Sequence, residues 1–298
     1  MTDAAIELVN VEKAYRFFRL TDAHLRLEAG QIMGLVGPNG AGKSTTIRIL
    51  MGMIRQDSGE VRVLGRSMPH EQAAAKRDIG FVSEDMRLYG AATLAWHMRF
   101  VASIYPDWDA KYADLLARRF NLHSDQTLKA FSHGERVKAT LLLALAHRPR
   151  LLLLDEPTTG LDPVARHEVL AELMDAIRDE HRAILFSSHN THDVEQICDV
   201  ITFVDRCRII DSSDKETFLD RWRRIHLDIP PTASIPVLPG TVDTSVSGRV
   251  AVITTSAYSP DLHAVCQQAG VVIRDVQRMT LEEIFISNVM SNRREALS

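Results

Sequence analysis

A glycine-rich run lies between an apolar segment and a segment with helical spacing. It consists of Gly37, Pro38, Asn39, Gly40, Ala41, Gly42, Lys43, Ser44 and Thr45, and it matches the template G-x-x-x-x-G-K-[ST] at every fixed position. Residues 31–36 before it predict a short buried strand, and residues 46–53 after it predict a helix. In such a run the backbone amides converge on phosphate oxygens at a helix N-terminus. The sequence therefore predicts a nucleotide-phosphate site, in which Lys43 reaches the β- and γ-phosphates and Ser44 binds Mg²⁺.

Two carboxylates follow a second apolar run. Asp155 and Glu156 come directly after residues 151–154, which are four leucines. A charge at the end of a buried strand is costly unless something pairs with it. We expect Asp155 to hold Mg²⁺, directly or through water, and Glu156 to polarise an attacking water. The alternative is a strand followed by an acidic turn, since Pro157 enforces a turn here.

A histidine follows a third apolar run. His189 comes after residues 183–186 and two serines. Because the carboxyl ends of parallel strands meet at one edge of a sheet, His189 is expected beside Asp155 and the glycine-rich run. There it can hydrogen-bond a γ-phosphate and orient water. The alternative is a helix cap, because residues 189–193 are rich in cap-forming side chains.

A second candidate anion site lies far from the first along the chain. Ser132 and Glu135 have the spacing of a capping box, and Gly134 lies beside the predicted helix start. Such a start favours an anion. One chain cannot easily fold both sites onto one phosphate, whereas two chains in head-to-tail contact can.

The surrounding elements predict an α/β fold. Apolar runs at 151–154, 183–186 and 200–204 predict parallel strands, and residues 91–146 have helical spacing. We expect an α/β core with a mostly parallel sheet over residues 1–218, with a helical insertion at about 84–150. A small C-terminal α+β domain is expected over residues 219–298. Within it, Ser259 and Pro260 predict a helix start, and Thr280 with Glu283 predicts a capping box.

Composition narrows the class of protein. The 298 residues carry a net charge of -4, which argues against a protein built mainly to bind nucleic acid. No apolar run approaches the roughly 20 residues of a membrane helix, and residues 1–7 do not have the pattern of a signal peptide. The three cysteines follow no metal spacing, so we expect buried thiols in a reducing cytoplasm.

Together these motifs resemble the nucleotide-binding subunit of ABC transporters, over residues 6 to about 218. The resemblance implies a P-loop NTPase core with an antiparallel β subdomain beside the mostly parallel sheet. In chain order the matches are Tyr15 as the adenine-stacking aromatic, residues 37–45 as Walker A, residues 131–135 with Ser132, His133, Gly134 and Glu135 as the signature, Asp155 and Glu156 as Walker B and its catalytic glutamate, residues 160–162 with Asp162 as the D-loop, and His189 as the switch histidine. A lone tyrosine such as Tyr15 is also compatible with simple packing.

The chain departs from the family at two motifs. Glu84 replaces the glutamine of the Q-loop, which keeps an oxygen for Mg²⁺ and adds a charge. In the signature, His133 replaces the first glycine and Glu135 the glutamine, whereas Ser132 and Gly134 are kept. Departures of this kind, and the closing residues 279–285, resemble the ATPases of ABC-2 type exporters.

The resemblance implies a function and partners. Two copies would close around two ATP molecules, with Lys43, Glu156, His189 and Glu84 as the catalytic groups and Ser44, Asp155 and Glu84 holding Mg²⁺. A membrane permease would dock on the segment from Asp85 to Tyr89, although core packing of its apolar side chains is the alternative. The protein would then lie at the cytoplasmic face of the inner or plasma membrane, as a peripheral subunit that drives export.

Two other functions remain open at this stage. One is an importer ATPase whose C-terminal domain binds a regulatory ligand. The other is a soluble, non-transport ABC ATPase. The usual marks of the soluble class, a second nucleotide domain or a long coiled coil, do not occur in this sequence.

Overall fold

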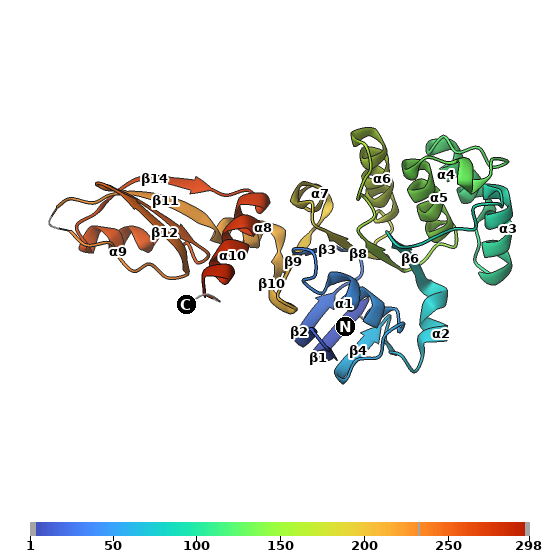
Figure 1. Cartoon of the computed structure of the whole chain (residues 1–298), viewed down its shortest axis with the longest axis horizontal. Helices are drawn as coiled ribbons and strands as arrows, with labels where there is room; N and C mark the ends of the chain where they lie inside the picture. Colours follow the sequence, from blue (N-terminus) through green and yellow to red (C-terminus); the bar gives the residue numbers. More distant parts are fainter. Residues whose placement is uncertain (1–3, 232, 296–298) are drawn as a thin grey trace. The chain divides into compact units, whose positions relative to one another are not determined.

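The computed structural model describes residues 4–231 and 233–295. The chain divides into two compact units, Met1–Ser212 and Ser213–Ser298 (Figure 1). The sequence predicts the boundary a little later, after residue 218. Among the described residues, no helix combines the length and the apolar character that a membrane crossing requires.

A six-stranded sheet forms the centre of the first unit, in the order β10-β9-β3-β8-β7-β6. Its strands are Ile32–Val36 (β3), Ile79–Ser83 (β6), Leu151–Asp155 (β7), Ala183–Ser188 (β8), Val200–Asp205 (β9) and Arg208–Asp214 (β10). The strands from β9 to β6 all pair in parallel. A strand that is covered on both faces needs an apolar side chain at nearly every position, so the apolar runs of the sequence correctly predict these central strands.

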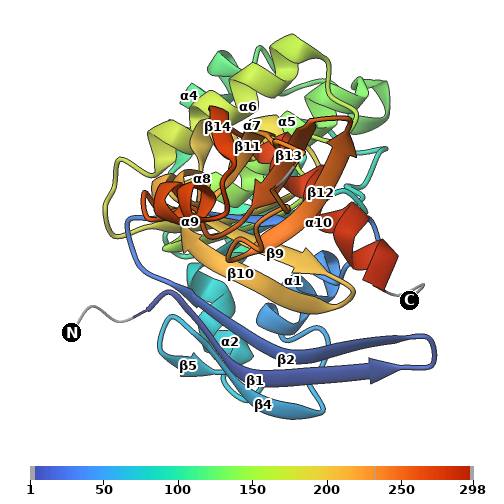
Figure 2. The ribbon, with the colours of Figure 1, turned by 90° about the vertical axis from the view of Figure 1, so that its left-hand side faces the viewer.

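An antiparallel sheet lies beside the central one, in the order β2-β1-β4-β5. Its strands are Ile6–Tyr15 (β1), Phe18–Leu27 (β2), Ser58–Val63 (β4) and Arg66–Ser67 (β5). Helix α1, Lys43–Leu50, contacts β4 of this sheet and β7 of the central sheet. Figure 2 shows α1 next to the antiparallel strands β1, β2 and β4. The short helices Gln72–Ala75 (α2) and Lys76–Asp78 (η1) lead into β6. The antiparallel subdomain is therefore confirmed, and α1 is held between two layers.

The helical insertion contains Leu94–Ile104 (α3), Ala110–Arg119 (α4), Leu128–Ala130 (η2) and His133–Leu145 (α5). Helices α3 and α4 both contact α5 (Figure 1). Each of the three α-helices begins at a side-chain cap, provided by Thr93, Asp109 and Ser132. Two further helices, Pro163–Ala176 (α6) and Thr191–Ile197 (α7), follow β7 and β8.

The second unit has its own four-stranded sheet, in the order β12-β13-β11-β14. Its elements are Lys215–Arg221 (α8), Arg223–Asp228 (β11), Thr241–Ser247 (β12), Val250–Thr255 (β13), Leu262–Gln268 (α9), Val272–Arg278 (β14) and Leu281–Glu295 (α10). Its core includes Ile225, Leu227, Ile253 and Leu262. The capping box of Thr280 and Glu283 is confirmed.

One predicted helix start in this unit is two residues too early. Helix α9 begins at Leu262, and its N-cap residue Asp261 makes no side-chain cap. Ser259 and Pro260 instead form a turn, in which the Leu262 N–H donates to the Ser259 carbonyl. A serine–proline pair therefore starts the turn that precedes the helix rather than the helix itself.

Candidate functional site

The glycine-rich run forms the loop between β3 and α1. Gly40 and Gly42 adopt φ angles of +80° and +112°, which favour glycine. A side chain at Gly37 would collide with the Val204 carbonyl. Gly42 is the N-cap of α1, and no side chain caps the helix. The first amides of α1 are therefore available for an anion.

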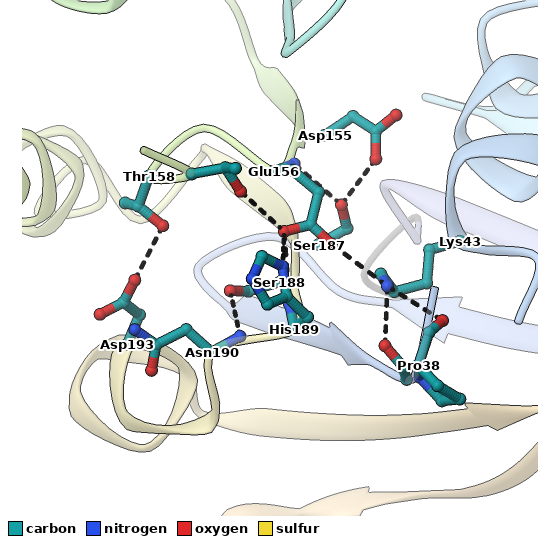
Figure 3. A network of polar contacts seen from close by, with 12 residues as sticks. Pro38, Lys43, Asp155, Glu156, Thr158, Ser187, Ser188, His189, Asn190 and Asp193 are labelled. Atoms are coloured by element: carbon teal, nitrogen blue, oxygen red, sulfur yellow. Dashed lines mark hydrogen bonds and ion pairs between the residues drawn. The ribbon is translucent and has the colours of Figure 1, made fainter. Parts of the chain in front are cut away.

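Lys43 is nearly buried at the start of α1 and makes three polar contacts (Figure 3). Its Nζ donates to the Gly37 carbonyl at 2.7 Å and lies 3.4 Å from the Pro38 carbonyl. The third contact is an ion pair of 3.1 Å with Glu156 Oε1. A lysine ammonium has three N–H donors, so this arrangement occupies all of them.

Glu156 adopts a left-handed backbone conformation, with φ +53°. For a residue other than glycine this conformation costs on the order of 1 kcal/mol, and such strain is common at functional sites. Its N–H is held by Ser187, through the side-chain oxygen at 3.0 Å and the carbonyl at 3.2 Å. The strained turn directs the carboxylate toward Lys43 on one side and His189 on the other (Figure 3).

The Glu156 carboxylate is well paired at its second oxygen. Oε2 accepts a hydrogen bond of 2.7 Å from His189 Nδ1 and one of 3.1 Å from the Thr159 hydroxyl. Burial, the largest influence, raises the pKa of Glu156, but Lys43 and His189 outweigh it and the net pKa lies below the ordinary value. Glu156 is therefore ionised at neutral pH, as a group that polarises water must be.

The oxygen donors near Ser44 suit Mg²⁺. Ser44 and Ser187 both donate to Asp155 Oδ1, at 3.1 Å and 2.7 Å. The Glu84 N–H donates to the Asp155 carbonyl at 3.1 Å, so the backbone of Glu84 lies next to Asp155. Hydroxyl and carboxylate oxygens are hard ligands, and Mg²⁺ at phosphates uses only one or two carboxylates. Within the described ranges no cluster of three His, Cys, Asp or Glu side chains forms a metal site.

A cleft of about 510 Å³ opens over the phosphate loop and brings most predicted residues together. It is lined by Phe18, Asn39, Gly40, Ala41, Gly42, Lys43, Ser44, Thr45, Glu84, Glu156, Thr159 and His189. Most of the predicted phosphate and catalytic residues therefore share one cavity, whereas the predicted metal ligand Asp155 does not line it and is connected to it through Ser44.

Tyr15 is not among the residues that line this cleft, whereas Phe18 is. The two rings meet edge to face with centroids 5.8 Å apart, and Tyr15 is 46 % exposed. The Phe18 ring also lies beside Gly42 of the phosphate loop. Sequence reasoning missed Phe18; the only signal was its place in the same hairpin, where it pairs with Tyr15.

The signature residues do not line the phosphate-loop cleft. The Ser132 hydroxyl accepts from the Glu135 N–H at 3.2 Å, and the Glu135 carboxylate accepts from the Ser132 N–H at 2.7 Å. This confirms the capping box at the start of α5. His133 instead lines a second cleft of about 340 Å³, between the segment after β6 and helix α5. The two clefts share Glu84, Glu156 and Thr159.

The segment after Glu84 is partly exposed. Met86 and Leu88 are half-buried and line the second cleft. Tyr89 is 66 % exposed and lies edge-on to Trp96 of α3, with centroids 6.2 Å apart. Apolar side chains of this segment are therefore accessible from outside the core.

Asp162 begins α6 and acts as its cap. Its carboxylate accepts hydrogen bonds from the N–H groups of Ala165 and Val164, at 3.0 Å and 2.9 Å. The bond from Ala165 is the main reason that the pKa of Asp162 lies below its usual value. The predicted D-loop residue thus has a structural role at this position.

Comparisons of the sequence and of the structure with known proteins find similar ATP-binding proteins. Residues 20–159 match the family described as "ABC transporter". The daunorubicin resistance ATP-binding protein DrrA3 of Streptomyces coeruleorubidus is 32% identical, with 99% of this chain and 98% of that protein covered. The Nod factor export ATP-binding protein I of Rhizobium johnstonii is 29% identical, with 96% and 95% covered. A solved structure of an ATP-binding subunit of an ABC transporter superposes with a TM-score of 0.67 at 26% identity, covering 72% of this chain and 92% of that chain.

Proposed function

The chain belongs to the ABC transporter family of ATPases, and we propose that it couples ATP hydrolysis to export through a separate membrane subunit. One observation carries the proposal: Lys43, Glu156 and His189 converge in a single network in the phosphate-loop cleft. The names of two relatives that match nearly the whole chain, a drug-resistance protein and a Nod factor export protein, support export rather than import.

The phosphate chain of ATP would lie at the N-terminus of α1. The free amides of this helix start and the Lys43 ammonium are placed to neutralise its charge. Ser44 and Asp155 would hold Mg²⁺, with Glu84 as a further oxygen ligand. The ion would supply charge neutralisation at the β- and γ-phosphates.

Two residues would act on the attacking water. Glu156 is ionised and is held by a strained turn, so it can accept a hydrogen bond from water without reorganising. His189 donates from Nδ1 to Glu156, which leaves Nε2 as the ring nitrogen for the γ-phosphate. Placement and charge stabilisation supply most of the rate in phosphoryl transfer.

A second copy of the chain would complete the site. Ser132 and Gly134 begin α5 and do not line the cleft of their own phosphate loop. This supports a homodimer in which they face the nucleotide of the other subunit, as the family resemblance implies. Asp162 would lie near the same contact.

The membrane subunit would dock on the segment from Asp85 to Tyr89. The exposure of Tyr89 and the half-burial of Met86 and Leu88 support this contact. Residues 219–298 would form an accessory domain, supported by the separate sheet and core of the second unit. An importer subunit with a regulatory C-terminal domain is the alternative.

The test is to purify the tagged chain from its own membranes, measure phosphate release with ATP and identify what co-purifies. A polytopic membrane protein should be retained, and Leu88→Asp should release it. Met174→Asp is the control, because Met174 is 44 % exposed near the C-terminal end of α6 and belongs to none of the proposed contacts. Retention of the same protein by Leu88→Asp would remove the docking proposal, and absence of ATP-dependent phosphate release would remove the coupled hydrolysis.

A further inference from the structure

The loop after Glu156, residues 157–162, is hydrogen-bonded to side chains of two helices. On one side the Thr158 hydroxyl donates a 2.7 Å hydrogen bond to Asp193 of α7 (Figure 3). On the other, His133 at the start of α5 donates from Nε2 to the Thr159 carbonyl at 3.0 Å. Consecutive threonines therefore connect this loop to two different helices.

The same loop also holds the candidate catalytic carboxylate. The Thr159 hydroxyl donates to Glu156 Oε2 at 3.1 Å, the oxygen that also accepts from His189. A displacement of Thr159 therefore moves a direct hydrogen-bond partner of Glu156. Catalytic placement is sensitive to shifts of this kind, because an error of about 1 Å at the reacting atoms costs on the order of 10²-fold in rate.

Two glycines, Gly160 and Gly134, lie around the contact between His133 and the loop. Gly160 has φ +72°, and a Cβ built there would lie 3.2 Å from His133 Nε2. The absence of a side chain at Gly160 thus makes room for the imidazole. Beside it, a Cβ on Gly134 would lie 3.4 Å from the Ala165 Cβ, so the starts of α5 and α6 are close together.

The tie to α7 is buried. Asp193 is fully buried and Thr158 is 3 % exposed. Arg166 of α6 forms a long ion pair with Asp193, with 3.9 Å between its Nε and the Asp193 carboxylate. Because α7 begins directly after His189 and Asn190, the Thr158 bond holds the loop against the helix that follows the candidate water-orienting histidine.

We propose that His133 is a positioning residue, which couples the orientation of helix α5 to the catalytic carboxylate of Glu156 through Thr159. In the signature of the family this position is a glycine, which has no side chain to make the bond, so the coupling depends on the departure at this position. The inference rests on the proposed ATPase function. Through this coupling, a movement of the start of α5, which is proposed to face a second subunit, would also move the Glu156 carboxylate of the same subunit.

The test compares His133→Gln, which keeps a donor near the Nε2 position, with His133→Leu, which removes it. His133→Leu should lower kcat about tenfold with KM for ATP changed less than twofold, because the phosphate loop is untouched. His133→Gln should keep kcat within about threefold of the parent protein. His123→Leu, at an exposed histidine in the same insertion, is the control and should change neither constant. Equal kcat for His133→Leu and the parent protein, or an equal loss in both His133 variants, would overturn the proposal.

A second measurement does not depend on hydrolysis. The N–H groups of Thr159 and Leu161 are hydrogen-bonded inside the loop, to the carbonyls of Glu156 and Thr158. Measured without added nucleotide, their hydrogen exchange should be about tenfold faster in His133→Leu and unchanged in His133→Gln. Unchanged exchange in His133→Leu would reject the coupling even if the parent protein hydrolyses ATP. Faster exchange in a chain without ATPase activity would keep the coupling and reject the proposed function.

The hydrogen bonds Thr158–Asp193 and His133–Thr159 can also be compared in a double-mutant cycle. Thr158→Val removes the bond to Asp193 and should lower kcat in the same way as His133→Leu. If both bonds hold one loop, the double variant should lose less than the product of the two single losses. Losses that multiply independently would show that the two bonds do not act on the same loop.

Discussion

Lys43 and Glu156 form an ion pair of 3.1 Å, with side-chain exposures of only 5% and 11%. The lysine proposed to bind phosphates is thus paired with the carboxylate proposed to polarise water. A γ-phosphate near Lys43 would compete with Glu156 for the same ammonium. In the proposed function, nucleotide binding would therefore release the Glu156 carboxylate from its ion pair.

Glu156→Gln should trap an ATP-bound dimer. The amide cannot act as a base, and loss of a general base costs about 10²–10⁴-fold in rate. It also ends the ion pair with Lys43, so ATP affinity should rise. Phosphate release and light scattering with ATP measure the two effects, and Glu60→Gln, at an exposed glutamate on β4, is the charge control. Normal hydrolysis by Glu156→Gln would show that another group polarises the water.

Phe18→Ala should weaken ATP binding by about tenfold, since stacking of a base on an aromatic ring is worth about 1–3 kcal/mol. Phe18 lines the cleft, whereas the neighbouring Phe17 is 89 % exposed and lies against Arg16. Phe17→Ala is therefore a matched control and should bind ATP normally, as titration with a fluorescent ATP analogue will show. A loss in Tyr15→Ala but not in Phe18→Ala would assign the base contact to Tyr15, as the family resemblance implies.

Glu84→Gln should raise the Mg²⁺ concentration that half-saturates the site severalfold. The change restores the amide of the family and removes one negative charge from a cleft that also holds Glu156. Titration calorimetry with a non-hydrolysable ATP analogue at fixed concentration measures the ion requirement directly. Asp85→Asn is the control, because Asp85 pairs with Arg48 on the surface and does not line the cleft. An identical Mg²⁺ curve for Glu84→Gln would remove Glu84 from the metal site.

The sequence predicts the elements of this site better than their contacts. Strand β7 is recognisable because burial on both faces requires the four leucines before Asp155. The Lys43–Glu156 contact depends on strand order, since β8 lies between β3 and β7 in the sheet. No local pattern encodes that order. The capping box of Ser132 and Glu135 was predictable because both partners lie within one turn.

Two features were beyond local reasoning for different physical reasons. The place of Phe18 depends on how the β1–β2 hairpin packs against the phosphate loop, beside Gly42, which no local pattern encodes. The bond from His133 ends on a backbone carbonyl, that of Thr159, which has no residue-specific signal in the sequence. The departure at residue 133 was visible in the sequence, but its partner was not.

A last prediction concerns stability in acid, away from the nucleotide site. His147 is 4 % exposed and stacks on Tyr105, with ring centroids 4.0 Å apart. Burial is the main reason that its pKa falls from 6.5 to about 4. Between these values the unfolded chain binds a proton that the folded chain does not, so the free energy of unfolding falls as the pH falls from about 6.5 to about 4.

His147→Phe keeps the ring against Tyr105 and removes the titrating group. Relative to its own value at pH 7, the variant should therefore be more stable than the parent protein at pH 5, by about 2 kcal/mol. Urea unfolding at the two pH values measures the difference, and comparing each protein with itself removes any packing cost of the larger ring. His70→Phe, at an exposed histidine, is the matched control and should follow the parent protein at both pH values. Parallel pH dependences for His147→Phe and the parent protein would show that His147 is protonated in the fold at pH 5.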